Sequence, residues 1–522
     1  MSGLAGQGLT ALATFPSARR GRRRPVLTLF AAVIGIILLL PLVAVLVDVQ
    51  QSGWSEVASV LFRARSAQLL INTLALPLIV TPLAAVIGTA AAWYTECTRL
   101  PGRRIWTVLL VLPVAMPDFI VGYAWHTIDP TASPLGAAVL VMTLSSYPLV
   151  YLPVAAALRR SDPALEEASR SLGLSSTRTF FRVVLPALRP AILGGCLIIA
   201  LVLVSEYGAF EIVRFQTFTT EGFTEFQVNP GAAGALSLPL ILIGVLLVTG
   251  ESLVSVPRAS GRTGMHRRTL VELHRGAIGL TAAFTALVAL AVVVPVATLV
   301  FWLQSSQHTT LPAQSTVLQA TLTTCEYCAG GAILAVVLAL PIAFLSARRS
   351  RGLPAVIERS TYLTLALPGV VIALSLIFIS LRIAFGIYET SWLVMIGYAV
   401  LTFPLALSCM KSSIRQAPEQ LTAIGRSLGR SAPYVFLRVT LPLIAPGIVA
   451  GFCLVFLTAS TELTATLVLQ PPDAMTLTTQ FWAFQSESAF GAAAPYGLVI
   501  ILLSTVPGAL LALWFDRAGQ RQ

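Results

Sequence analysis

The chain has 522 residues, of which 56% are hydrophobic and only 11% are charged, whereas soluble domains carry about 25% charged residues. The mean hydropathy of +0.84 leaves too few polar side chains to cover several soluble domains, and the long apolar runs and six cysteines exclude a disordered chain and a disulfide-stapled secreted scaffold. The net charge of +12 is the excess of 34 basic over 22 acidic residues, and the basic residues cluster between apolar runs, which indicates membrane topology rather than nucleic-acid binding.

Twelve apolar stretches reach about 20 residues or more, the length that a helix needs to cross a membrane. The sequence therefore predicts an all-α polytopic membrane protein with twelve transmembrane helices. We place them at residues 26–47, 68–95, 105–127, 135–158, 190–213, 235–256, 277–303, 317–346, 356–382, 390–411, 446–469 and 494–515.

The basic residues predict the orientation of these helices. If the arginine cluster at residues 19–24 is cytoplasmic, all but four of the 34 basic residues face the cytoplasm; the exceptions are Arg63, Arg65, Arg214 and Arg382. The positive-inside rule then places both termini in the cytoplasm. A cleaved signal peptide is the alternative for the first apolar run, but that run exceeds the usual length of about 7 to 15 residues, and no small-residue cleavage pattern follows it.

An internal repeat divides the chain. Residues 148–206 align with 404–462 without a gap at an offset of 256; for example, Arg170-Ser171-Leu172-Gly173 matches Arg426-Ser427-Leu428-Gly429. We predict a cytoplasmic tail at 1–25, a first six-span repeat at 26–256, a cytoplasmic linker at 257–276, a second six-span repeat at 277–516 and a cytoplasmic tail at 517–522. The two repeats have the same orientation and are therefore parallel.

The similarity is strongest in a cytoplasmic loop, at 159–189 in the first repeat and 412–445 in the second. In the first copy, Asp162 and Pro163 form a helix-start signal and Gly173 suits a left-handed stop. Ser175 or Ser176 then caps a second short helix that ends at Pro186. The second copy offers Pro418, Gly429, Ser431 and Pro442 for the same roles. Such a pair is either a docking ledge for a partner present in two copies or an amphipathic pair lying on the membrane.

These loops resemble the EAA loop of ATP-binding-cassette importer permeases, whose pattern is E-A-A, three residues, G, nine residues and I-x-L-P. The matching residues of the first loop are Glu167, Ala168, Gly173, Leu185 and Pro186. In the second loop, Ala423, Gly425, Gly429, Leu441 and Pro442 stand at the equivalent positions, and the glutamate is missing. This departure puts in question whether the two loops contribute equally to coupling.

Two six-span units in one chain resemble the fused permeases of the ferric-iron importer group. Segments 116–125, 205–209, 216–220 and 461–467 are also similar to that group, although permeases for thiamine, phosphonates and polyamines share parts of them. The resemblance implies the type I importer fold in a bacterial inner membrane. It also implies ferric iron as the solute, an extracytoplasmic binding protein that delivers it, and two copies of a cytoplasmic ATPase that bind ATP and Mg and dock on the loops.

The chain itself carries no ATPase motif. A phosphate-binding loop requires G-x-x-x-x-G-K-[ST], and the only lysine, Lys411, follows Met410 rather than glycine. We therefore expect no catalytic residue and no cofactor in this chain, and no nucleic-acid partner.

Acidic residues inside spans are candidates for the translocation path. Glu206 and Glu462 occupy matching repeat positions, and their oxygen atoms suit a hard cation such as ferric iron without establishing a metal site. The structural alternative is a buried carboxylate bonded to a neighbouring hydroxyl or paired with Arg214. Tyr207, Thr461 and Asp118 are further candidates, with capping of a helix that resumes after Pro117 as the alternative for Asp118.

The sequence offers one further motif and two other classes of function. Cys325 and Cys328 have C-x-x-C spacing around Glu326, but in so apolar a helix they are better interpreted as small buried side chains. A proton- or sodium-coupled secondary transporter is the rival class, in which Glu206, Glu462 and Glu326 would be proton relays. A membrane-embedded enzyme is a third class, but the sequence offers no pairing of nucleophile and base to support it.

Overall fold

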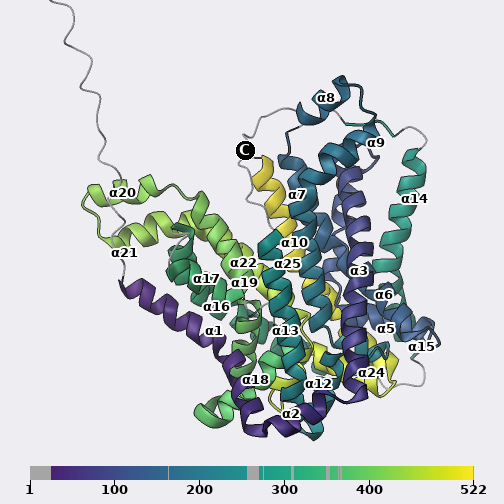
Figure 1. Cartoon of the computed structure of the whole chain (residues 1–522), viewed down its shortest axis with the longest axis vertical. Helices are drawn as coiled ribbons and strands as arrows, with labels where there is room; N and C mark the ends of the chain where they lie inside the picture. The colour runs from purple at the N-terminus through teal and green to yellow at the C-terminus, as the bar shows by residue number, and fades with distance from the viewer. Residues whose placement is uncertain are drawn as a thin grey trace, which may run out of the picture.

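The computed structural model describes residues 25–162, 164–254, 270–273, 276–306, 311–348, 353–362, 364 and 367–520. The predicted N-terminal basic tail, most of the linker, Pro163 and the last two residues lie outside this part of the chain. Within it the fold is helical, and an isolated parallel bridge between Thr98 and Val271 is the single strand-type pairing (Figure 1).

The helices follow one another in two similar series. The first series is α1 (Pro25–Ser52), α2 (Trp54–Leu61), α3 (Ala64–Cys97), α4 (Arg103–Leu109), η1 (Leu112–Ala115), α5 (Asp118–Ile128), α6 (Pro134–Ser146), α7 (Pro148–Arg160), α8 (Ala164–Ser171), α9 (Ser176–Thr179), η2 (Phe180–Val184), α10 (Leu185–Ser205), α11 (Gly208–Ile212), α12 (Phe218–Val228) and α13 (Pro230–Val254). The second is α14 (Gly276–Val288), η3 (Ala289–Val293), α15 (Val294–Ser305), α16 (Gln314–Arg348), α17 (Leu353–Tyr362), α18 (Gly369–Ile383), η5 (Phe385–Ile387), α19 (Ser391–Gln416), α20 (Glu419–Ser427), α21 (Ala432–Val435), η6 (Phe436–Thr440), α22 (Leu441–Ser460), α23 (Thr464–Leu469), α24 (Leu477–Ser486) and α25 (Phe490–Gln520).

Ten helices of the described chain are long and apolar enough to cross a membrane, and a bent helix pair raises the number to 11. The predicted twelve spans are therefore not confirmed. The predicted third span is the bent pair, in which Arg103–Ala115 and Asp118–Ile128 meet at 89°. The predicted ninth span is divided into α17 and the 15-residue α18.

Proline explains both interruptions. Pro117 and Pro368 occupy the N-cap positions of α5 and α18. Proline lacks a backbone N–H and disfavours the helical conformation at the residue before it, so an upstream helix ends there and a new one begins.

The predicted helix at the end of each loop extends further than expected. Pro186 and Pro442 do not end a helix, because the π-helical turns η2 and η6 lead directly into α10 and α22. Both prolines therefore lie inside a continuous helix, and the wider π turn before each of them accommodates the proline ring and the missing N–H bond. At the opposite ends, α10 stops at Ser205 and α22 at Ser460, short of the predicted boundaries at 213 and 469.

The first long span of each series, α1 in the first and α14–η3–α15 in the second, packs against the other series. α1 contacts α16, α17 and α18, whereas α15 contacts α5, and η3 contacts α6 (Figure 1). Ile34 and Leu38 of α1 belong to the same core cluster as Ile357 of α17 and Val371 of α18. The two halves are therefore interlocked rather than placed side by side.

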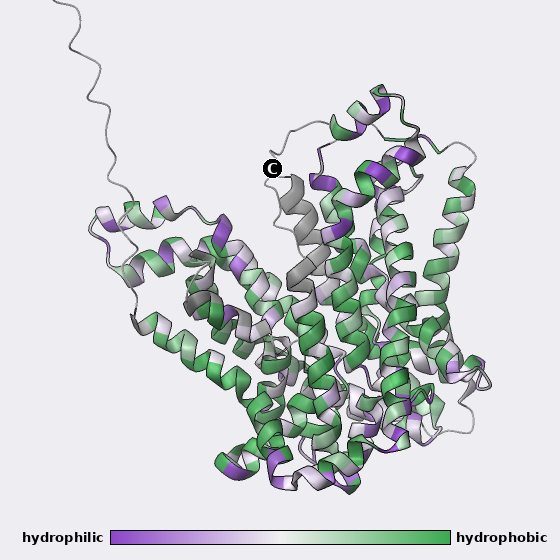
Figure 2. Ribbon diagram, viewed as in Figure 1, coloured by the Kyte–Doolittle hydropathy of each residue, from purple (hydrophilic) through white to green (hydrophobic). Residues whose placement is uncertain are grey.

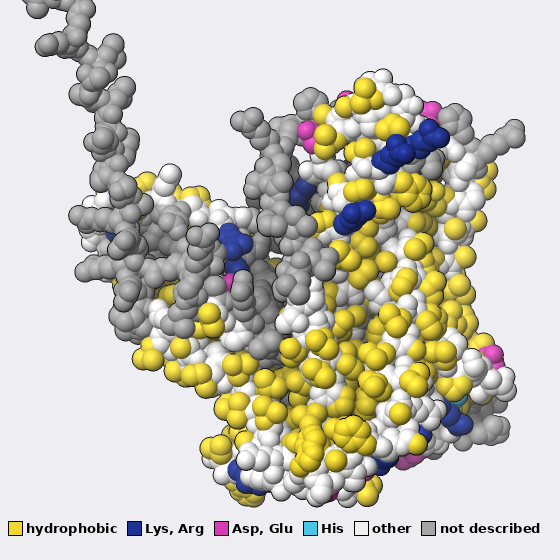
Figure 3. All heavy atoms as spheres, in the orientation of Figure 1, with side chains coloured by type: hydrophobic (Ala, Val, Ile, Leu, Met, Phe, Trp, Pro, Cys, Tyr) yellow, Lys and Arg dark blue, Asp and Glu magenta, His cyan; other side chains and the backbone are white. Residues whose placement is uncertain are grey.

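Side chains of different polarity occupy different levels of the molecule. Figure 2 shows apolar residues along the middle of the helices and hydrophilic residues toward the two ends. The outer surface of α3 exposes Ile71, Leu78 and Val86, and Figure 3 shows an apolar belt between two edges that carry basic side chains. An exposed apolar belt of this kind matches lipid rather than water.

Candidate functional site

The first predicted loop forms two helices joined by a glycine turn. α8 begins after Asp162, whose carboxylate accepts a hydrogen bond from the Ala164 N–H at 2.9 Å. Gly173 ends it with φ +85°, and the Gly173 and Leu174 N–H groups donate to the carbonyls of Arg170 and Ser169. This is the Schellman arrangement, in which the left-handed residue favours glycine, so the predicted stop at Gly173 is confirmed.

The second loop repeats this turn. α20 begins after Pro418, and Gly429 has φ +76° with N–H bonds from Gly429 and Arg430 to the carbonyls of Arg426 and Gly425. Ser431 is the N-cap residue of α21 but makes no side-chain capping bond. In the first loop, by contrast, the Ser175 hydroxyl accepts a bond from the Arg178 N–H at 3.4 Å.

The contact between the two short helices differs between the loops. In the first, the buried hydroxyls of Ser169 and Thr179 are hydrogen-bonded at 2.9 Å. The residues 256 positions later are Gly425 and Val435, and a Cβ added to Gly425 would lie 3.0 Å from Val435 Cγ2. A polar contact in one loop is thus replaced by a close apolar contact in the other.

Both loops expose apolar side chains at matching positions. Leu172 is 83% exposed and Leu428 is 74% exposed, each directly before its left-handed glycine. Leu165 and Phe181 are also exposed, as are Leu421 and Leu437 at the same offset of 256. Figure 1 shows α8 and α20 at the same end of the molecule. We call these six exposed side chains the loop knobs: Leu165, Leu172, Phe181, Leu421, Leu428 and Leu437. They were not predicted as contact residues, although apolar side chains in a polar loop can indicate a binding surface.

The remaining loop residues divide by burial. Glu167, Ala168 and Ala423 are exposed on α8 and α20. Leu185, Pro186 and Leu441 are half-buried at the starts of α10 and α22, and Pro442 is exposed there.

Glu206 and Glu462 lie beyond helix ends rather than inside helices, which corrects the predicted placement. Glu206 is the extended C-cap residue of α10, and its Oε1 accepts a hydrogen bond from the Ala209 N–H of α11 at 2.8 Å. Glu462 lies between α22 and α23 and accepts one from the Ala465 N–H of α23 at 3.0 Å. Neither glutamate forms an ion pair in the described structure, so pairing with Arg214 is ruled out. Each caps the short helix that follows it.

The central acidic group consists of Asp118, Glu206 and Glu462. Asp118 is the first residue of α5 and forms no side-chain cap, so the capping role proposed for it is wrong. Gly208, two residues after Glu206, is in close contact with the neighbours of the other two acids, because a Cβ there would lie 3.0 Å from Phe119 Cβ and 2.7 Å from Leu463 Cδ2. All three residues are half-buried. They come from interrupted segments of both halves, although no set of three metal-ligating side chains is preassembled among the described residues.

The second half has a glycine where the first has Asp118. Gly369 follows Pro368 at the start of α18, and a Cβ there would lie 3.0 Å from Glu462 Oε1. The interrupted helix of each half therefore meets the glutamate of the same half.

Tyr207 lies in the contact between the halves. Its ring is 4% exposed and packs against Phe223 and, at a centroid distance of 5.5 Å, against Trp482 of the second half. A Cβ added to Gly208 would lie 2.7 Å from Leu463 Cδ2. Thr461 is half-buried and donates to the Thr458 carbonyl. The halves are in close contact at this level.

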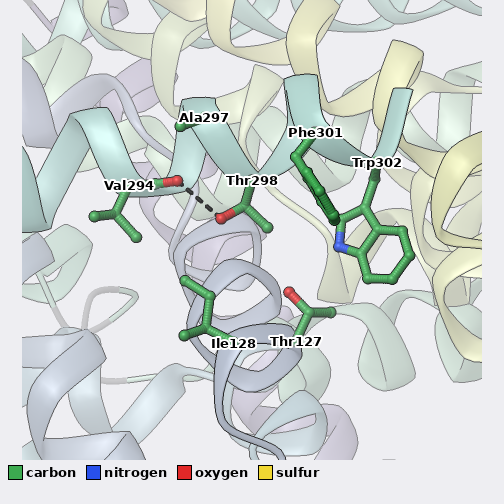
Figure 4. A pocket seen from close by; sticks show the side chains of 7 residues that line it. All are labelled: Thr127, Ile128, Val294, Ala297, Thr298, Phe301 and Trp302. Carbon is green, nitrogen blue, oxygen red and sulfur yellow. Dashed lines mark hydrogen bonds between the residues drawn. The ribbon is translucent and has the colours of Figure 1, made fainter. Parts of the chain in front are cut away.

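Cys325 and Cys328 have free thiols, and Cys328 is fully buried, in agreement with its interpretation as a small core residue. A cavity of about 440 Å³ lies apart from the predicted residues, between α5 and α15 (Figure 4). Its lining is mainly apolar, and the Thr298 hydroxyl is bonded to the Val294 carbonyl at 2.9 Å.

Comparison with known proteins identifies the family. Residues 84–253 and 336–519 match the family described as binding-protein-dependent transport system inner membrane component. The chain is 38% identical over 94% of its length to the Fe(3+)-transport system permease protein FbpB 2 of Haemophilus influenzae, and the match covers 98% of that protein. It is 22% identical over 97% of its length to the ferric transport system permease protein FbpB of Actinobacillus pleuropneumoniae, covering 81% of it.

A sulfate transport system permease protein CysT of Salmonella typhimurium is 31% identical over 34% of this chain and 69% of its own length. One matched region lies in each of the two similar series of helices. The chain belongs to the inner-membrane permeases of binding-protein-dependent ATP-binding-cassette importers, as a fused two-unit transport component that is not itself catalytic.

Proposed function

We propose that this permease forms the translocation path for ferric iron, which an extracytoplasmic binding protein delivers and which ATP hydrolysis on two ATPase subunits drives inward. The proposal that two ATPase subunits drive transport rests on the two loops, which share the same glycine turn and the same exposed apolar positions. The solute part is supported by the names of two relatives that match nearly the whole chain.

Each loop is proposed to dock on one ATPase. The loop knobs supply apolar anchors, and rigid turns at Gly173 and Gly429 hold them in place. Arg170 and Arg426 stand at equivalent positions of the two loops, whereas Glu167 is replaced by Ala423. Two identical ATPase subunits would therefore meet the same apolar side chains, but only the first loop would present the glutamate. A few kcal/mol of coupling between nucleotide state and membrane state is within reach of two such contacts.

We propose that the bent pair and the α17–α18 segment complete twelve spans in two parallel repeats. Both termini and both loops then face the cytoplasm, where most basic residues lie. ATP and Mg would bind only to the partner subunits.

The central acidic group is proposed to contact the solute. Carboxylate oxygens suit a hard trivalent cation, and the half-buried residues Asp118, Glu206 and Glu462 come from interrupted segments of both halves. The helix interruptions beside these residues place non-helical backbone at membrane depth, which is tolerated where it is buried in protein or lines a cavity.

Reconstitution into vesicles with the cognate binding protein and ATPase tests this function. Uptake of radioactive ferric iron should require ATP and all three components, with thiamine, a phosphonate and a polyamine as alternative solutes. Deletion of residues 163–186 should abolish co-purification of the ATPase. Uptake that ignores ATP and collapses with an ionophore would instead establish the secondary transporter.

A further inference from the structure

An ion cluster with a buried carboxylate at its centre joins three helix ends near the first loop. The Glu96 side chain, in the last turn of α3, is 3% exposed. Its Oε1 accepts hydrogen bonds from Arg159 Nε at 2.9 Å and Nη2 at 2.6 Å, and its Oε2 accepts one from Arg103 Nη2 at 3.2 Å. Arg159 lies at the end of α7 and Arg103 at the start of α4.

Burial of the carboxylate makes this cluster different from an ordinary surface ion pair, although the side chains of Arg103 and Arg159 are 39% and 58% exposed. A carboxylate removed from water is stable only when paired, and both Glu96 oxygens are occupied by guanidinium groups. The nearby pair of Arg99 and Glu272 has a similar short distance, 2.7 Å, but its side chains are 65% and 58% exposed. Surface pairs of that kind contribute little.

In the second half, an ion pair joins α17 and α19, the helices that occupy the places of α4 and α7. Lys411, near the end of α19, pairs with Glu358 of α17, and both side chains are largely buried. The repeat offset does not relate this pair to the first cluster, because Ala155 corresponds to Lys411 and Arg415 to Arg159. Two unrelated sets of charges thus connect the same kinds of element.

The connected elements run from each loop to the central acidic group. α7 and α19 lead into the loop helices α8 and α20. α4 and α17 precede the interruptions at Pro117 and Pro368, beyond which lie Asp118 and the Gly369 contact with Glu462.

We propose that the Glu96–Arg103–Arg159 cluster and the Glu358–Lys411 pair are positioning links that transmit movement of the loops to the interrupted helices. This inference rests on the proposed function, because the movement is the one that docked ATPases would impose. The links hold α7 and α19, which lead into the loops, against α4 and α17, which lead toward the central acidic group.

A charge exchange tests the second link. In vesicles with the ATPase and binding protein, Glu358→Lys or Lys411→Glu should lower the iron transported per ATP hydrolysed about tenfold, within the usual range of coupling energies. The double exchange should restore the ratio, while co-purification of the ATPase and the amount of folded permease stay unchanged throughout. If the single variants keep the wild-type ratio, or the exchange fails to restore it in a folded permease, the link is wrong.

The first link has a matched control. Glu96→Gln should reduce the same ratio, whereas Glu272→Gln, which removes an exposed pair nearby, should leave it unchanged. Arg103→Gln keeps the Arg159 bonds and provides a milder variant if Glu96→Gln does not fold. An unchanged ratio in folded Glu96→Gln or Arg103→Gln would overturn this part.

Lys411 also offers a direct probe because it is the only lysine. Permease grown with lysine labelled with ¹³C at Cε gives one side-chain resonance, which should shift when unlabelled ATPase is trapped with ATP, and should not shift in Glu358→Gln. A resonance that stays fixed in the transport-competent wild type contradicts the link. Absence of ATP-driven uptake in the wild type would contradict the proposed function itself.

Discussion

At the scale of single residues, the two matched glutamates combine a structural and a proposed transport role. Glu206 and Glu462 cap short helices through one oxygen, which leaves charge and a second oxygen for a cation. Glutamine retains an oxygen acceptor and removes the charge, whereas alanine removes both. The two substitutions therefore separate the cap from the charge.

We expect Glu206→Ala or Glu462→Ala to destabilise the permease by about 1 kcal/mol, the usual value of a lost cap. The corresponding glutamine variants should unfold at nearly the wild-type temperature while the doubly substituted protein loses iron uptake. Thermal unfolding in detergent and vesicle uptake measure the two effects. Full uptake by the double glutamine variant would remove both residues from the path.

The contact inside each loop makes a second prediction at this scale. Gly425→Ser should crowd Val435 and destabilise the second loop by about 1 to 3 kcal/mol, and Val435→Thr in the same chain should recover much of that loss by recreating the Ser169–Thr179 bond. A double-mutant cycle of denaturant midpoints measures the interaction. Strictly additive effects would show that the two positions do not interact.

At the scale of elements, the left-handed glycines fix the direction in which each loop helix leaves its turn. A residue with a Cβ is strained at φ +85° or +76°, so the turn would shift to relieve the strain. The loop knobs Leu172 and Leu428 directly precede these glycines and would move with them.

Gly173→Ala and Gly429→Ala should therefore each cost about 1 to 2 kcal/mol locally and weaken ATPase binding. Gly194→Ala is the control, because Gly194 lies within α10 and a Cβ there meets no atom within 4 Å. Titration of the ATPase against permease in lipid nanodiscs measures the affinity. Equal affinities for Gly173→Ala and the control would exclude the turn from docking.

At the scale of the whole molecule, the exchange of first helices makes each half depend on the other. Within a membrane, helices associate through packing rather than through exclusion of water, so the close fit of α1 on the second half matters more than its apolarity. Gly35 illustrates the fit, since a Cβ there would lie 3.3 Å from Ile357 Cγ2.

Residues 1–262 and 263–522, expressed together as two chains, should therefore assemble and co-purify. Removal of residues 1–52 from the first chain should abolish much of that association, because α1 no longer covers α17 and α18. Affinity purification through a tag on the second chain measures it. Retention of the shortened first chain at the full level would contradict a stabilising exchange.

The sequence alone predicted most of what depends on local chemistry. Apolar length identified the long spans, the repeat identified two halves, and Gly173 and Gly429 marked the loop turns because only glycine adopts that backbone readily. The family match agrees with the resemblance of the loops. These features depend on neighbours within about a turn or on spacing along the chain.

Tertiary structure decided the features that depend on distant residues. Glu96 meets Arg159 across 63 positions, and α1 meets the second half; neither contact has a periodic signal. The helix break after Ser205 was also missed. A continuous apolar run predicts one helix, and it does not reveal that the Glu206 carboxylate caps a new helix, α11. Side-chain partners in space, rather than composition, determined where helices stop and which charges pair.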